Sequence, residues 1–192
     1  MQCMSMKENN AVAFDALERL KEGNRNYINA TNCVGDVSLA RRQETSVNGQ
    51  HPYAVVVSCA DSRVIPEAVF SCGIGDIFVI RVAGNVIGNM ELGSIDYAVE
   101  HLGCRLVVVM GHTGCGAVNA ALSVNHGLVA HITDEIKRAI GDEHDEIRAS
   151  VLNVKQSVCK IRQALTAAED LLVCGAMYHT DSGVVDFDLD TL

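Results

Sequence analysis

The chain has 192 residues, of which 48% are hydrophobic and 20% charged, so it is long enough for one ordinary core and too apolar to be disordered. Its formal net charge of -9 disfavours a nucleic-acid partner, because phosphate binding needs a basic face. No apolar run approaches the roughly 18 to 20 residues that cross a bilayer, which argues against a membrane partner. The polar start has no secretory pattern, so we expect a cytoplasmic chain.

The N-terminal region is expected to be helical. Ala13, Leu17 and Leu20 share one face of a helix that Asn10 can cap and Gly23 can end. A second short helical stretch is expected over residues 25–30. We interpret residues 1–35 as an arm that packs on something else, such as another subunit.

The centre of the chain alternates between apolar strands and helices. Continuous β-branched runs predict strands buried on both faces, as in a parallel sheet, at residues 54–58, 77–83, 106–110 and 171–176. Helical patterns lie between them, at residues 66–70, 92–102, 117–122 and, with a break near Gly141, 128–168. The alternating run at residues 184–189 predicts an edge strand. We therefore expect a single α/β domain, 1–192, with a mostly parallel central sheet flanked by helices and a site core at 50–122.

Three metal-binding side chains follow two of these strands. Cys59 comes directly after the run AVVVS, and His112 follows LVVVM and one glycine. Ligands of open α/β sheets bind at the carboxyl ends of the strands, so both side chains are expected at one edge. Cys115 lies three residues after His112 and can face the same point. Two thiolates and one imidazole are a known catalytic zinc set, which leaves one position for water.

The segment after Cys59 adds a charged pair. Asp61 and Arg63 are two residues apart in a tight turn and can form an ion pair. A carboxylate held by arginine is poorly placed to bind the metal, but it can accept a hydrogen bond from the water there. Other sites fit less well: Ile65 stands where a phosphatase loop needs arginine, and neither a dinucleotide fingerprint nor a Cys-x-x-Cys motif is present.

Together these residues resemble the β-class carbonic anhydrases. The resemblance covers nearly the whole chain and is strongest from Gln50 to Leu122; its segments are SCADSRVIPE (58–67), FVIRVAGNVIG (78–88), GSIDYAVEHLG (93–103) and VVMGHTGCGAV (108–118). It implies one Zn²⁺ per subunit on Cys59, His112 and Cys115, with Asp61 and Arg63 as the orienting pair.

The resemblance also implies a substrate pocket. Gln50 matches an amide donor, Phe78 and Tyr97 match aromatic pocket residues, and Gly116 matches a backbone N–H that faces the substrate. His101, four residues after Tyr97, is a candidate proton shuttle. Part of this pocket comes from the neighbouring subunit in the family, which implies a homodimer or an assembly of dimers.

The expected reaction is the reversible hydration of carbon dioxide to bicarbonate and a proton. Hydrolysis of carbonyl sulfide or carbon disulfide at the same zinc is an alternative, because these substrates are also linear and apolar. A non-catalytic zinc protein or redox sensor is a second alternative, which would show four protein ligands or reactive cysteines and no hydration activity.

Overall fold

A computed structural model of the chain describes residues 11–29, 35–123, 127–168 and 170–191. It confirms the α/β class with a five-stranded sheet in the order β2-β1-β3-β4-β5. The first four strands are parallel, and β5 runs antiparallel to β4. Their bounds are β1 Ala54–Ser58, β2 Ile77–Arg81, β3 Leu106–His112, β4 Leu172–Tyr178 and β5 Val185–Asp186.

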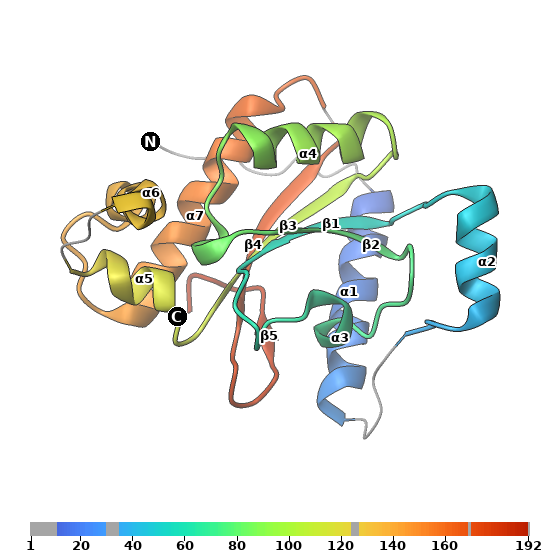
Figure 1. Ribbon diagram of the computed structural model, residues 1–192, viewed down its shortest axis with the longest axis horizontal. Helices are drawn as coiled ribbons and strands as arrows, with labels where there is room; N and C mark the ends of the chain where they lie inside the picture. Colours follow the sequence, from blue (N-terminus) through green and yellow to red (C-terminus); the bar gives the residue numbers. More distant parts are fainter. Residues whose placement is uncertain (1–10, 30–34, 124–126, 169, 192) are drawn as a thin grey trace.

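Helices cover both faces of the sheet (Figure 1). The predicted break near Gly141 is confirmed, since one helix ends and the next begins on either side of it. Among the described residues the helices are α1 Ala11–Asn29, α2 Leu39–Asn48, α3 Pro66–Val69, α4 Asn89–Glu100, α5 Gly116–Ala121, α6 Ala130–Ile140 and α7 Glu146–Ala164, with short 3₁₀ turns η1 Ala83–Asn85 and η2 Gly127–Val129.

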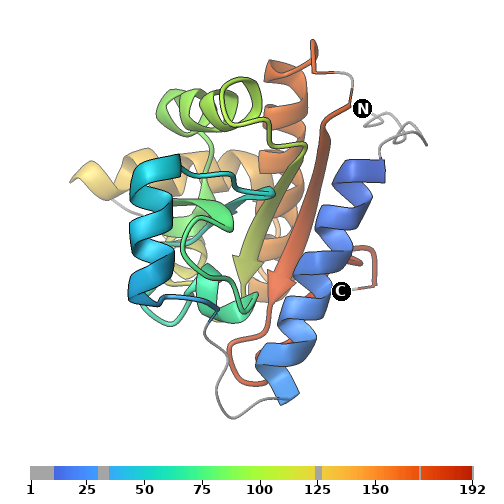
Figure 2. The same ribbon diagram turned by 90° about the vertical axis from the view of Figure 1, so that its right-hand side faces the viewer.

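Strands β1 and β3 are buried along their whole length, as the continuous apolar character of these runs predicts. The same prediction was wrong for β2, an edge strand that is only partly buried, from a buried Ile77 to an exposed Arg81. Val56 and Val108 point into the core under α1 and α3. Val55 and Val109 point into the core under α4 and α7. Figure 2 shows α1 lying along one face of β4, with α7 on the opposite face. The carboxyl ends of the neighbouring strands β1 and β3 thus lie between a layer formed by α1 and α3 and a layer formed by α4 and α7.

Helix α1 differs from the prediction, because it continues through Gly23 to Asn29 as one helix. Gly23 is needed for a close approach, since a Cβ atom there would lie 1.9 Å from the Phe70 carbonyl oxygen. The next residue, Asn24, donates to the carbonyls of Val69 (3.1 Å) and Gly183 (2.9 Å). The predicted N-terminal helix is thus present and packs on its own chain; its contact with another subunit stays a prediction. The expected cap, Asn10, lies outside the described residues.

Helix α2 was not predicted. It begins after Ser38, whose hydroxyl accepts a hydrogen bond from the Arg41 N–H (3.1 Å), and ends at Gly49 with a φ of 79°. None of its residues is buried, and it stands apart from the sheet in both views (Figures 1 and 2). A helix with no face in the core gives no strong apolar periodicity, which explains the omission.

Smaller differences concern strand ends. Strand β3 extends two residues beyond the predicted run, so that His112 is its last residue. The final edge strand is confirmed but is limited to Val185–Asp186. In the described ranges, no helix is long and apolar enough to cross a membrane.

Candidate metal centre

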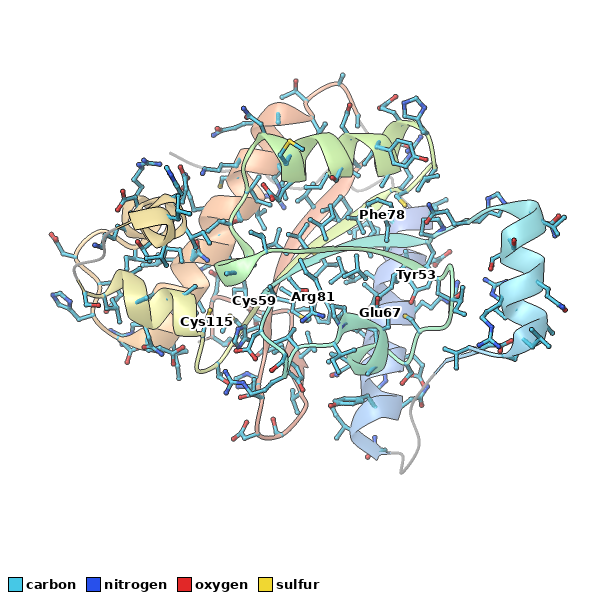
Figure 3. The ribbon with its side chains drawn as sticks, viewed as in Figure 1. Tyr53, Cys59, Glu67, Phe78, Arg81 and Cys115 are labelled. Atoms are coloured by element: carbon cyan, nitrogen blue, oxygen red, sulfur yellow. The ribbon has the colours of Figure 1, made fainter. Side chains whose placement is uncertain are left out.

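The structure brings Cys59, His112 and Cys115 together at the carboxyl edge of the sheet. β1 and β3 are parallel neighbours with Ser58 opposite Met110, so the residues that end these strands are adjacent. Cys115 follows a turn at Gly114 (φ 68°) and caps α5. One ligand atom from each of the three residues lies within 4.8 Å of the other two, and all three residues are buried. Figure 3 shows Cys59 and Cys115 side by side at this edge.

The donor atoms fit a soft divalent cation such as zinc. Nδ1 of His112 donates to the Thr113 carbonyl (3.0 Å), because a carbonyl oxygen can only accept, and this turns Nε2 toward the two sulfurs. Nε2 is buried and has no hydrogen-bond partner among the described residues. Tetrahedral zinc with sulfur ligands at about 2.3 Å holds them about 3.8 Å apart, which agrees with the observed clustering.

The two thiols do not titrate independently. A hydrogen bond from Cys115 lowers the pKa of Cys59 to about 4, although burial opposes this shift. The pKa of Cys115 is raised by the same contact with Cys59 and by burial. Cys115 is therefore the thiol that keeps its proton, and binding of a cation to both sulfurs would release that proton.

An ion pair lies next to this cluster. The Arg63 guanidinium donates to both carboxylate oxygens of Asp61, through Nε (3.0 Å) and Nη2 (2.7 Å), and Nη2 also donates to the Gly114 carbonyl (2.9 Å). These bonds hold the pKa of the Asp61 carboxyl well below its usual range. Its Oδ2 atom lies 3.9 Å from His112 Nε2, so an ionised acceptor is fixed at the rim of the cluster.

Comparison with known proteins identifies the family. The carbonic anhydrase family model matches residues 54–185. A carbonic anhydrase of Mycolicibacterium smegmatis is 36% identical over 94% of this chain and 95% of its own length. Carbonic anhydrase 2 of Mycobacterium tuberculosis is 44% identical over 69% of this chain and 64% of its own length. The solved β-carbonic anhydrase CafA of Aspergillus fumigatus is 28% identical, with a TM-score of 0.72 over 78% of this chain and 82% of CafA.

The chain belongs to the β-carbonic anhydrases. This family consists of lyases, and the matched region contains the whole of the Cys59–His112–Cys115 cluster. A structure described as one of two tetrameric β-carbonic anhydrases of Sordaria macrospora is also similar, at 26% identity and a TM-score of 0.63, over 77% of this chain and 89% of that one.

The pocket residues expected of a β-carbonic anhydrase separate into two groups. Gly116 follows Cys115 and opens α5, and a Cβ atom there would meet no other atom within 4 Å. Phe78, however, is opposite Val55 in the sheet, four residues before Cys59, which corresponds to about 13 Å along the strand. Figure 3 shows it well away from Cys59.

The remaining pocket residues lie with Phe78, not with the metal cluster. Its ring centroid is 6.2 Å from that of Tyr97, which in turn is 5.3 Å from that of His101. Gln50 precedes β1 at the amino end of the strand, and it lines an open cleft of about 740 Å³ together with Tyr97 and His101. A single chain therefore does not bring these four residues to its own cluster.

The contacts of Arg81 and Gly84 with the cluster were not foreseen from the sequence. Arg81, the last residue of β2, donates to the carbonyls of Asp61 (Nη2, 2.7 Å) and Cys59 (Nε, 3.3 Å). The Gly84 N–H donates to the Cys59 sulfur (3.2 Å). An arginine that closes an apolar strand was the only available signal for the first contact, and no motif marks the second.

Proposed function

We propose that the chain is a zinc carbonic anhydrase that catalyses the reversible hydration of carbon dioxide to bicarbonate and a proton. The observation that carries this proposal is the buried Cys59–His112–Cys115 cluster with an ionised Asp61 at its rim. Membership of the β-carbonic anhydrases supports the reaction, and the two-sulfur, one-nitrogen donor set supports zinc, with one ion per chain.

Zinc bound there would polarise a water molecule and lower its pKa, although by less than in a three-histidine site, because two thiolates cancel its charge. Asp61 stays ionised through Arg63 and accepts a hydrogen bond from the attacking water, which orients it toward the carbon atom. The Gly116 N–H, at the start of α5, stabilises the negative charge that develops on the substrate oxygen.

We further propose that the working enzyme is a homodimer or an assembly of dimers. Gln50, Phe78 and Tyr97 lie at the amino end of the sheet, so they would complete the pocket of a partner subunit, where His101 would pass the proton to solvent. The exposed helix α2, with Leu39 61% and Val47 83% exposed, provides a surface for that partner. The tetrameric Sordaria relatives are consistent with such assembly.

The chain would act as a single domain, with residues 50–122 supplying the zinc site. We place it in the cytoplasm, because two zinc-binding thiols must stay reduced and that compartment keeps them so.

Stopped-flow carbon dioxide hydration with matched zinc analysis tests the proposal. We expect fast hydration from protein with one zinc per chain, loss of activity after chelation, and recovery when zinc returns. Carbonyl sulfide and carbon disulfide are assayed in parallel on the same samples. If either sulfur compound is turned over faster than carbon dioxide, that compound becomes the proposed substrate. Zinc-loaded protein inactive on all three would indicate a non-catalytic zinc protein.

A further inference from the structure

Helix α7 carries a stripe of polar side chains on its inward face. Glu146, Ser150, Asn153 and Ser157 are spaced by four, three and four residues, so they share one side of the helix. Three of them are almost fully buried, with 2% of Ser150, 3% of Asn153 and 3% of Ser157 exposed. Buried polar groups cost free energy unless they are hydrogen-bonded, so their partners indicate what the stripe does.

The first residue of the stripe holds the turn that carries one cysteine. Oε1 of Glu146 accepts hydrogen bonds from the N–H groups of Gly114 (3.0 Å) and Cys115 (3.2 Å). The Ser150 hydroxyl donates to the same oxygen (3.4 Å). Gly114 has a φ of 68°, and this reversal turns Cys115 back toward Cys59. Glu146 therefore fixes the backbone from which the Cys115 sulfur projects.

The middle of the stripe holds the turn that contacts the other cysteine. Nδ2 of Asn153 donates to the Gly84 carbonyl (2.7 Å), and the Gly84 N–H donates to the Cys59 sulfur (3.2 Å). Gly84 and Asn85 both have left-handed backbone conformations, with φ of 70° and 44°, so this turn cannot continue as a regular helix or strand. The Ser157 hydroxyl supports it further by donating to the Asn85 carbonyl (3.3 Å).

We propose that Glu146 and Asn153 are positioning residues that hold the two cysteine ligands from one helix. The inference rests on the zinc site proposed above. The two residues are seven positions apart, about 10.5 Å along a rigid helix, so α7 fixes one turn relative to the other. The Gly84 N–H also withdraws charge from the Cys59 sulfur, and Asn153 keeps it aimed there. Partners of metal ligands that orient them in this way alter both metal retention and the electronic state of the site.

The experiment uses zinc-loaded protein and two variants, Glu146→Ala and Asn153→Ala. Transfer of zinc to a chromophoric chelator is followed over time, and we expect release about 10 to 100 times faster from both variants. In cobalt-substituted protein, the thiolate-to-cobalt absorption band should shift in Asn153→Ala, because the N–H···S contact is disturbed. Glu146→Gln keeps an acceptor oxygen, so it should release zinc at a rate close to that of the wild-type protein, unlike Glu146→Ala.

Asn24→Ala is the matched control. Asn24 is likewise a buried asparagine (4% exposed) that donates to backbone carbonyls, but its backbone partners are Val69, Gly183 and Val185, away from the cluster. It should lower the melting temperature as Asn153→Ala does, while zinc release and the cobalt spectrum stay as in wild type. Equal acceleration of zinc release in Asn24→Ala would show general destabilisation and overturn the inference.

The outcomes separate this inference from the proposed function. Wild-type protein that holds no zinc would overturn both. Wild-type protein that holds zinc, with variants that release it at the wild-type rate and show an unshifted spectrum, would overturn only the role of α7. If Asn153→Ala does not fold, Glu146→Ala decides alone, because Glu146 is partly exposed at the first turn of the helix.

Discussion

Two arginines hold different parts of the turn after Cys59. Arg63 binds the Asp61 carboxylate through both oxygens, whereas Arg81 binds the main-chain carbonyls of Cys59 and Asp61. Asp61 is therefore held both through its side-chain carboxylate and through its main-chain carbonyl. A group held in this way loses little conformational entropy when it orients a reactant, which favours catalysis.

This arrangement predicts the effect of Asp61→Asn. The amide has nearly the same shape but no charge, so it would orient the attacking water less well and weaken the contact with Arg63. We expect kcat/KM for carbon dioxide to fall about 10- to 100-fold while zinc stays at one per chain. Asp170→Asn, which removes a surface partner of Arg105, should leave the rate unchanged. A wild-type rate in Asp61→Asn would exclude Asp61 from the mechanism.

A second prediction concerns Cys59, which we propose as a zinc ligand. The serine hydroxyl of Cys59→Ser stays protonated near neutral pH and is a poor zinc ligand, so bound zinc should fall below about a tenth of an ion per chain. Elemental analysis after dialysis measures this. Cys104→Ser is the control, because Cys104 is also buried but its sulfur donates to the Pro52 carbonyl and is not part of the metal cluster. Full zinc occupancy in Cys59→Ser would contradict the ligand assignment.

Site residues differed in how far the sequence could predict them. The clustering of Cys59, His112 and Cys115 was predictable, because residues that end neighbouring parallel strands must meet at one edge. The contacts of Arg81 and Glu146 were not, because each joins segments 20 or more residues apart that form no local motif. Only the packing of β2 and α7 against the cluster reveals them.

At the scale of secondary-structure elements, Gly23 determines how closely α1 approaches the sheet. Gly23→Ala would favour the helix by about 1 kcal/mol through propensity alone. The added methyl group would, however, collide with the Phe70 carbonyl, a backbone atom that cannot rotate away. We therefore expect a net loss of about 1 to 3 kcal/mol in the free energy of unfolding.

Urea unfolding at constant m-value measures this change. The control is Glu22→Ala, the neighbouring exposed position of α1, where the free energy should change by less than about 0.5 kcal/mol. A Gly23→Ala protein as stable as wild type would show that α1 can move away from Phe70 at little cost.

The same helix shows where pattern reasoning reaches its limit. Strand β1 was predicted to the residue and β3 nearly so, because continuous β-branched runs have few other stable environments. Gly23 was interpreted as a helix end because glycine commonly follows one. Its actual role, the close approach to Phe70, depends on a contact 47 residues away and cannot be inferred from local sequence.

At the scale of the whole molecule, the two halves of the expected active site lie at opposite ends of the sheet. Cys59, His112 and Asp61 are at the carboxyl edge, whereas Gln50 and Phe78 are near the amino edge. A two-fold dimer in which the amino edge of one subunit meets the carboxyl edge of the other would form two complete sites. Each site would then take residues from both chains.

Complementation between two defective chains tests this arrangement. Gln50 is exposed in the single chain, so Gln50→Ala should leave the fold and the chain's own zinc cluster intact while impairing the partner's site. Asp61→Asn impairs only the site on its own chain. In a heterodimer of the two variants, one site receives both defects and the other receives none.

Co-expression with two affinity tags yields this heterodimer, and it should recover about half of the wild-type carbon dioxide hydration activity. Each variant homodimer stays defective at both sites and serves as the control. If Gln50 instead served its own chain, every site in the heterodimer would carry one defect, and activity no higher than that of the parent variants would refute the shared pocket.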